Sequence, residues 1–121
     1  MNLLTQNLIK ESVNLLGVDN YALYDFPNNQ NEFFDYFKPV KGVDNTGNIT
    51  YLEKEEYPFD YETFIDKFNE VKNTYELKEY QRQRAAEYPS FADQFDILYH
   101  DGYDAWKVEI DKIKDKYPKP E

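Results

Sequence analysis

The chain has 121 residues and a mass of 14.6 kDa, which suits one ordinary domain or a small domain with an extension. Its 14 Lys and Arg against 24 Asp and Glu give a formal net charge of −10, which argues against binding nucleic acid or anionic lipid, because both require a basic surface. The absence of cysteine and the single histidine exclude disulfides, thiolate sites and a multi-histidine metal centre within one chain.

The N-terminal stretch Met1–Leu16 has the leucine spacing of an amphipathic helix that ends at Gly17. Polar residues interrupt it throughout, and no window approaches the roughly 20 apolar residues of a membrane-spanning helix, so we expect neither a signal peptide nor a membrane segment. Two interpretations stay open. The helix packs on the core of its own chain, or it is an arm that buries its leucines on a neighbouring subunit.

The following residues predict irregular chain and then a β-hairpin. Residues 18–30 are rich in Asn, Asp and Pro, which favour turns, and residues 33–37 are mostly aromatic. Two short β-prone runs, Val40–Val43 and Ile49–Leu52, flank a turn in which Gly47 can take a positive φ.

From Asp60 the apolar spacing becomes helical. One helix extends to Tyr88-Pro89, a second begins after the N-cap residue Ser90 and ends at Asp101-Gly102, and a third carries Trp106 and ends before Pro118. The three helices are expected to form a unit with a core of its own.

These elements predict a mainly α protein with a small β-hairpin. Its segments are an N-terminal amphipathic helix and irregular arm (residues 1–30), an aromatic segment with the hairpin (31–59) and a C-terminal helical module (60–121). The predicted core residues are Phe64, Phe68, Tyr88, Pro89, Phe95, Leu98, Trp106, Ile110 and Ile113.

One cluster has residue types that bind metal ions. Asp93, Asp96, His100 and Asp101 share a predicted helix, but acidic residues in a first turn and a histidine in a last turn also complement the helix dipole. Nothing completes a coordination shell, so the dipole interpretation is favoured and we expect no metal site.

Other chemical motifs are incomplete. Asp44 and Glu55 have the spacing of a calcium loop, but Ile49 stands where that loop requires glycine. No nucleotide-binding or hydrolase motif occurs. We expect no catalytic residue and no cofactor, and therefore a protein that is not an enzyme. Arg82 and Arg84 predict either surface ion pairs or contacts with carboxylates of another subunit.

The last third of the chain resembles a known module. The segment RQRAAEYPSFADQFDILYHDGYDAWK, residues 82–107, is followed by Lys-Tyr-Pro at 116–118. This pattern is similar to a C-terminal module of tailed-bacteriophage proteins, notably small virion, tail-fibre-associated and tail-assembly proteins of marine and cyanobacterial phages. Phe91 and Phe95 depart from the aliphatic residues usual there. The resemblance implies a packing or docking module.

The expected function is therefore that of a structural phage virion protein, associated with the tail or tail fibre, that joins subunits in a symmetric assembly. Its expected partners are other phage structural proteins, with no nucleic acid and no membrane, and its location is the virion. The predicted interface residues are Leu4, Leu8, Leu15, Tyr21, Tyr24, Phe33, Phe34 and Phe37. Two alternatives remain: a tail assembly chaperone, and an acidic DNA mimic that inhibits host defence.

Overall fold

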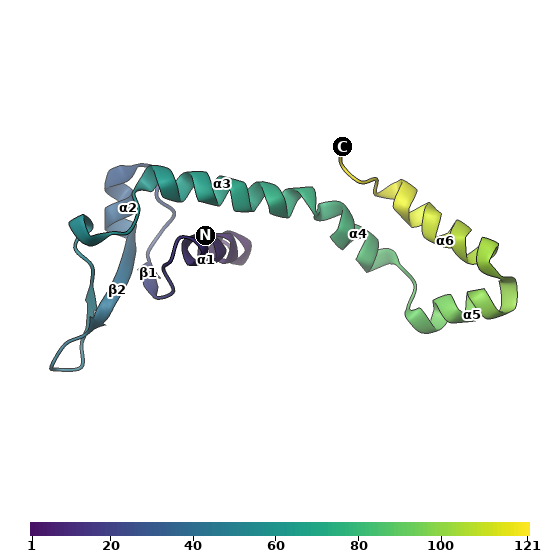
Figure 1. The fold of residues 1–121 in the computed structure, drawn as a ribbon, viewed down its shortest axis with the longest axis horizontal. Coiled ribbons are helices and arrows are strands. Elements are labelled where there is room, and N and C mark those ends of the chain that lie inside the picture. The colour runs from purple at the N-terminus through teal and green to yellow at the C-terminus, as the bar shows by residue number, and fades with distance from the viewer. The chain divides into compact units, whose positions relative to one another are not determined.

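The computed structural model describes residues 1–121 and contains six α-helices, one 3-10 helix and three β-strands (Figure 1). The predicted fold class, mainly α with a small β-hairpin, is confirmed. The chain divides into two compact units, Met1–Asn73 and Thr74–Glu121. This division differs from the predicted segments, because the N-terminal arm, the hairpin region and most of the first long helix belong to one unit.

Helix α1 (Leu3–Leu15) has defined ends on both sides. The side chain of Asn2 accepts a hydrogen bond from the Thr5 N–H at 2.8 Å, which caps the first turn. At the other end Gly17 has a φ of 96°, and the Val18 N–H donates to the carbonyl of Val13 at 2.8 Å, the pattern of a Schellman cap. Leu8, Ile9, Ser12 and Val13 are buried, so the structure favours the interpretation in which α1 packs within its own chain.

The sheet has one strand more than predicted. Strand β2 (Phe37–Val43) pairs with β3 (Ile49–Tyr51) as the expected antiparallel hairpin, and β1 (Tyr21–Leu23) adds to it in antiparallel register. The sequence predicted irregular chain at β1. Three residues are too few to show an alternating pattern, and this strand is defined by its pairing with the first half of β2.

Asp44 organises the hairpin turn. Its carboxylate accepts hydrogen bonds from the Thr46 N–H at 2.8 Å, the Thr46 hydroxyl at 2.6 Å and the Asn48 N–H at 3.0 Å, and Gly47 has the predicted positive φ, at 86°. These bonds, the Thr46 hydroxyl first, hold the pKa of the Asp44 carboxyl below its usual value. The turn interpretation of this loop is confirmed.

An aromatic core fills the first unit. Phe33 on α2 (Gln30–Tyr36) is fully buried and lies within 5.3–6.3 Å, between ring centroids, of six other rings. These rings come from α2, β2, the loop after the 3-10 helix η1 (Lys54–Glu56) and the start of α3 (Tyr61–Leu77): Phe34, Phe37, Tyr57, Phe59, Tyr61 and Phe64. Because α3 supplies Phe64 and Phe68 to this core, its first half belongs to the N-terminal unit.

The second unit consists of α4 (Glu79–Glu87), α5 (Phe91–Asp101) and α6 (Tyr103–Lys116), with α5 and α6 packed as a hairpin (Figure 1). The sequence predicted one continuous helix to Tyr88, but α3 ends at Leu77. The Tyr75 carbonyl there accepts from the Lys78 N–H at 3.2 Å and from the Arg82 guanidinium at 2.9 Å, which replaces the helical bond expected from residue 79.

No residue of α4, α5 or α6 is buried. The predicted core residues Tyr88, Pro89, Leu98, Trp106, Ile110 and Ile113 are only half-buried, and Phe95 is exposed. The prediction of a self-contained C-terminal core is therefore wrong. Two layers of helices of this length have too few facing positions to enclose a side chain from all directions.

Candidate functional site

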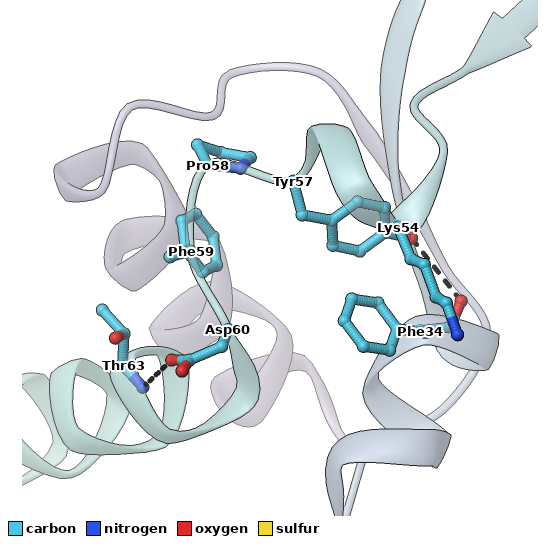
Figure 2. A pocket seen from close by; sticks show the side chains of 7 residues that line it. All are labelled: Phe34, Lys54, Tyr57, Pro58, Phe59, Asp60 and Thr63. Carbon is cyan, nitrogen blue, oxygen red and sulfur yellow. Dashed lines mark hydrogen bonds between the residues drawn. The ribbon is translucent and has the colours of Figure 1, made fainter.

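A hollow on the surface of the first unit is walled by Phe34 of α2, Lys54 of η1, the loop residues Tyr57 to Asp60, and Thr63 of α3 (Figure 2). Figure 2 shows the rings of Phe34 and Tyr57 on one side, with Lys54 beside them, and Asp60 and Thr63 on the other side. The Lys54 ammonium lies 5.9 Å from the centroid of the Phe34 ring, a cation–π distance.

The polar groups of this hollow are already engaged by the fold. The Tyr57 hydroxyl donates to the Phe37 carbonyl at 2.6 Å, and burial, followed by the charges of Asp35 and Glu53, raises the pKa of that phenol. The Asp60 carboxylate accepts from the Thr63 N–H at 2.9 Å and so caps α3; this hydrogen bond lowers its pKa. Both groups are used in hydrogen bonds within the fold. The hollow therefore offers a ligand mainly its aromatic walls and the Lys54 ammonium group.

The acidic cluster on α5 takes the helix-dipole arrangement. Ser90 is the N-cap residue, and its hydroxyl oxygen accepts from the Asp93 N–H at 3.1 Å, while His100 lies in the last turn. No group of three or more His, Cys, Asp or Glu side chains is arranged to hold a metal ion.

The predicted interface residues divide into three sets. Leu8, Phe33 and Phe37 are buried in the first unit, so the interface prediction is wrong for them, because the aromatic core of the same chain covers these rings and α1 packs on its own unit. Tyr21 and Phe34 are half-buried, whereas Leu4, Leu15 and Tyr24 are exposed. For this exposed set the interface stays a prediction.

A chain of hydrogen bonds joins the two helices of the C-terminal hairpin to the turn before it. The Trp106 indole N–H donates to the Gln94 side-chain carbonyl at 3.0 Å, and the Gln94 amide donates to the Pro89 carbonyl at 2.8 Å. Sequence analysis assigned no role to Gln94, because a glutamine on a helix carries no local signal of such a contact. Its four-residue distance from the half-buried Leu98 places it on the inward face.

Polar contacts also fix the end of α6 against α4. The Arg84 guanidinium donates to the carbonyl of Tyr117 at 2.8 Å and of Lys114 at 3.3 Å, and so satisfies the last turn of α6. The Glu87 carboxylate accepts from the Lys116 ammonium at 2.8 Å and from the Tyr117 hydroxyl, which lowers the pKa of Glu87. Arg84 thus follows neither predicted interpretation, since its partners are backbone carbonyls of its own chain.

Arg82 does form the predicted surface ion pair. It bonds to Glu79, one helical turn away, and its guanidinium lies 3.6 Å from the centroid of the Tyr75 ring.

Helix α5 presents large apolar side chains to solvent. Phe91, Phe95 and Tyr99 are 79%, 66% and 85% exposed and follow one another at intervals of four residues, so they form a single row on the helix. We call these three residues the α5 ridge. Phe95 and Leu98 were both predicted as core residues, but only Leu98 is half-buried; Gln94 contacts Trp106 of α6, and the ridge lies outside.

No family model, no curated protein and no solved structure matches this chain. None of its helices is both long enough and apolar enough to cross a membrane.

Proposed function

We propose that this protein is a structural component of a phage virion, associated with the tail or tail fibre, that joins protein subunits and has no catalytic role. The observation that carries the proposal is the α5 ridge, three aromatic side chains exposed on a unit that has no buried residue. The largest exposed apolar patch of a small monomeric protein is about 300–600 Å² and is often functional, and larger patches mark sites of association. Phe and Tyr side chains are enriched at the centres of such interfaces.

The assignment to a phage particle rests on the pattern of residues 82–118. In this structure polar residues of that pattern join the helices of the second unit: the Gln94–Trp106 bond links α5 to α6, and bonds of Arg84 and Glu87 link α4 to the end of α6. A pattern that encodes a helical hairpin supports a docking role, and in this chain the hairpin also exposes the α5 ridge, although Phe91 and Phe95 are departures from that pattern. Two of the exposed leucines of α1, Leu4 and Leu15, supply a second candidate contact on the other unit.

The test is quantitative mass spectrometry of phage particles purified from infected cells that produce this protein. A structural subunit is expected at a reproducible copy number that fits the symmetry of the organelle. Absence from mature particles, together with abundant protein in the lysate of infected cells, would overturn the structural role in favour of an assembly chaperone.

A variant pair sharpens this test. Phe95→Ser removes the central ring of the α5 ridge and is expected to reduce incorporation at least tenfold. Val108→Ser replaces an exposed apolar side chain of α6 and is expected to leave incorporation at the wild-type level.

A further inference from the structure

The α5 ridge has an arrangement that fits a second copy of itself. We propose that two copies of this chain associate through their α5 helices, which pack antiparallel about a twofold axis near Phe95. This inference rests on the proposed function, because it names a second copy of the chain as the partner that binds the α5 ridge.

The spacing of the ridge supports this pairing. Phe91 and Tyr99 lie at equal distances of four residues on either side of Phe95, so a twofold rotation at Phe95 sets Phe91 of one copy against Tyr99 of the other. An isologous contact of this kind uses the same patch on both copies.

The area that the ridge offers approaches what a dimer requires. With about 200 Å² for each aromatic side chain, the exposed fractions of the three rings amount to about 450 Å² per copy. If these rings became completely buried, two copies would bury at most about 900 Å² through them, slightly less than the ~1,000 Å² that a specific interface should exceed. Ala92, which is exposed beside Phe91, and the half-buried Leu98 border the ridge and add to this area.

The charge of the second unit also permits self-association. Residues 74–121 carry eleven acidic and eight basic side chains, whereas residues 1–73 carry thirteen and six. The unit that bears the ridge is thus the more balanced one, and repulsion between two copies arises mainly from the first unit. Salt screens this repulsion without weakening apolar contacts, so association is expected to strengthen as salt rises from 20 to 500 mM.

Sedimentation equilibrium of the full chain tests the proposal. At about 100 μM and 150 mM salt we expect a mass of twice 14.6 kDa, and we expect Phe95→Ser to weaken the dimer at least tenfold. Val108→Ser, with circular dichroism to confirm folding of both variants, is expected to dimerise as the wild type does. A monomer at 100 μM at every salt concentration, or equal dimerisation of Phe95→Ser, would overturn the proposal.

The chain has no cysteine, so disulfide trapping can test the antiparallel geometry. When Phe91→Cys and Tyr99→Cys copies are mixed and oxidised, the antiparallel pairing predicts that disulfides between the two variants exceed those within either variant. Predominance of disulfides within each variant would overturn the antiparallel arrangement.

These results are distinct from those of the particle analysis. A monomeric protein that is still present at fixed copy number in particles overturns only the self-pairing. A dimer that is absent from particles overturns only the structural role.

Discussion

The two units of this protein are stabilised in different ways. The first encloses Phe33, Phe37 and Phe64 completely within a cluster of other rings, so its stability derives mainly from apolar burial. The second has no buried side chain, and its helices are held by half-buried contacts and by polar bonds of Arg84, Gln94 and Glu87.

This difference shows that aromatic content alone does not determine where a core forms. Both units are rich in Phe and Tyr, but those of the first unit converge from α2, β2 and α3, whereas those of α5 are exposed to solvent. A ring stabilises its own chain only if several elements surround it. In the second unit the same residue types remain available to another molecule.

The largest expected effect is at the centre of the first unit. Phe33→Ala removes a fully buried ring with six ring neighbours and should cost about 3–5 kcal/mol of the free energy of unfolding, measured by urea denaturation. The exposed Tyr24 serves as control, and Tyr24→Ala should change stability by less than about 0.5 kcal/mol. Equal losses for both variants would contradict the division into a buried core and an exposed surface.

A smaller effect tests whether α1 belongs to the first unit. Ile9→Ala removes a fully buried side chain and should destabilise the protein by about 2–4 kcal/mol, seen as a lower urea midpoint. Leu15→Ala, at an exposed position on the same helix, should have little effect on unfolding. If Ile9→Ala unfolds like the wild type, α1 is a detachable arm.

The stability of the α5–α6 hairpin should depend on the hydrogen bonds of the Gln94 side chain. Gln94→Ala removes the bonds to Trp106 and Pro89 and should cost about 1–2 kcal/mol, followed by the fluorescence of Trp106, which is the single tryptophan. Gln83→Ala, on the exposed surface of α4, is the matched control. An unchanged Trp106 transition in Gln94→Ala would show that apolar packing alone holds the hairpin.

The smallest expected effect concerns pH. The bonds from Lys116 and Tyr117 lower the pKa of Glu87 in the folded protein, so their contribution is present above the unfolded pKa of about 4.3 and is lost as pH falls through the lower folded value. Titration of hairpin stability between pH 6 and 2, by Trp106 fluorescence, should show this loss in the wild type and a flatter profile in Glu87→Gln. Glu76→Gln removes a charge of the same sign away from Lys116 and Tyr117 and should retain the wild-type slope.

Local signals in the sequence predicted most of the secondary structure. Gly17, Gly47 and Ser90 act through their own φ angles or side chains, and the turns and caps they form were predicted. The start of α2, which was not predicted, has a similar local signal, since Asn29 caps the helix by accepting from the Glu32 N–H at 2.9 Å.

Features that depend on distant partners were not predictable. Strand β1 exists because β2 lies beside it, and at the end of α3 the Tyr75 carbonyl accepts from the guanidinium of Arg82, seven residues further along the chain. The side of α5 that faces solvent was unpredictable for the same reason. Phe91, Phe95, Leu98 and Tyr99 form one broad apolar arc on a helical wheel, and only the position of α6 decides which part of that arc faces inward.

Gly102 has a consequence for the order of folding. This residue ends α5 and begins α6 with a φ of 88°, so almost no chain lies between the two helices. Closing so short a connection costs little entropy, and contacts between residues near in sequence form on the microsecond scale. The aromatic core of the first unit must instead bring together α2 and α3, which are about thirty residues apart. The hairpin is therefore expected to assemble first, and to present its aromatic row while the rest of the chain is still unfolded.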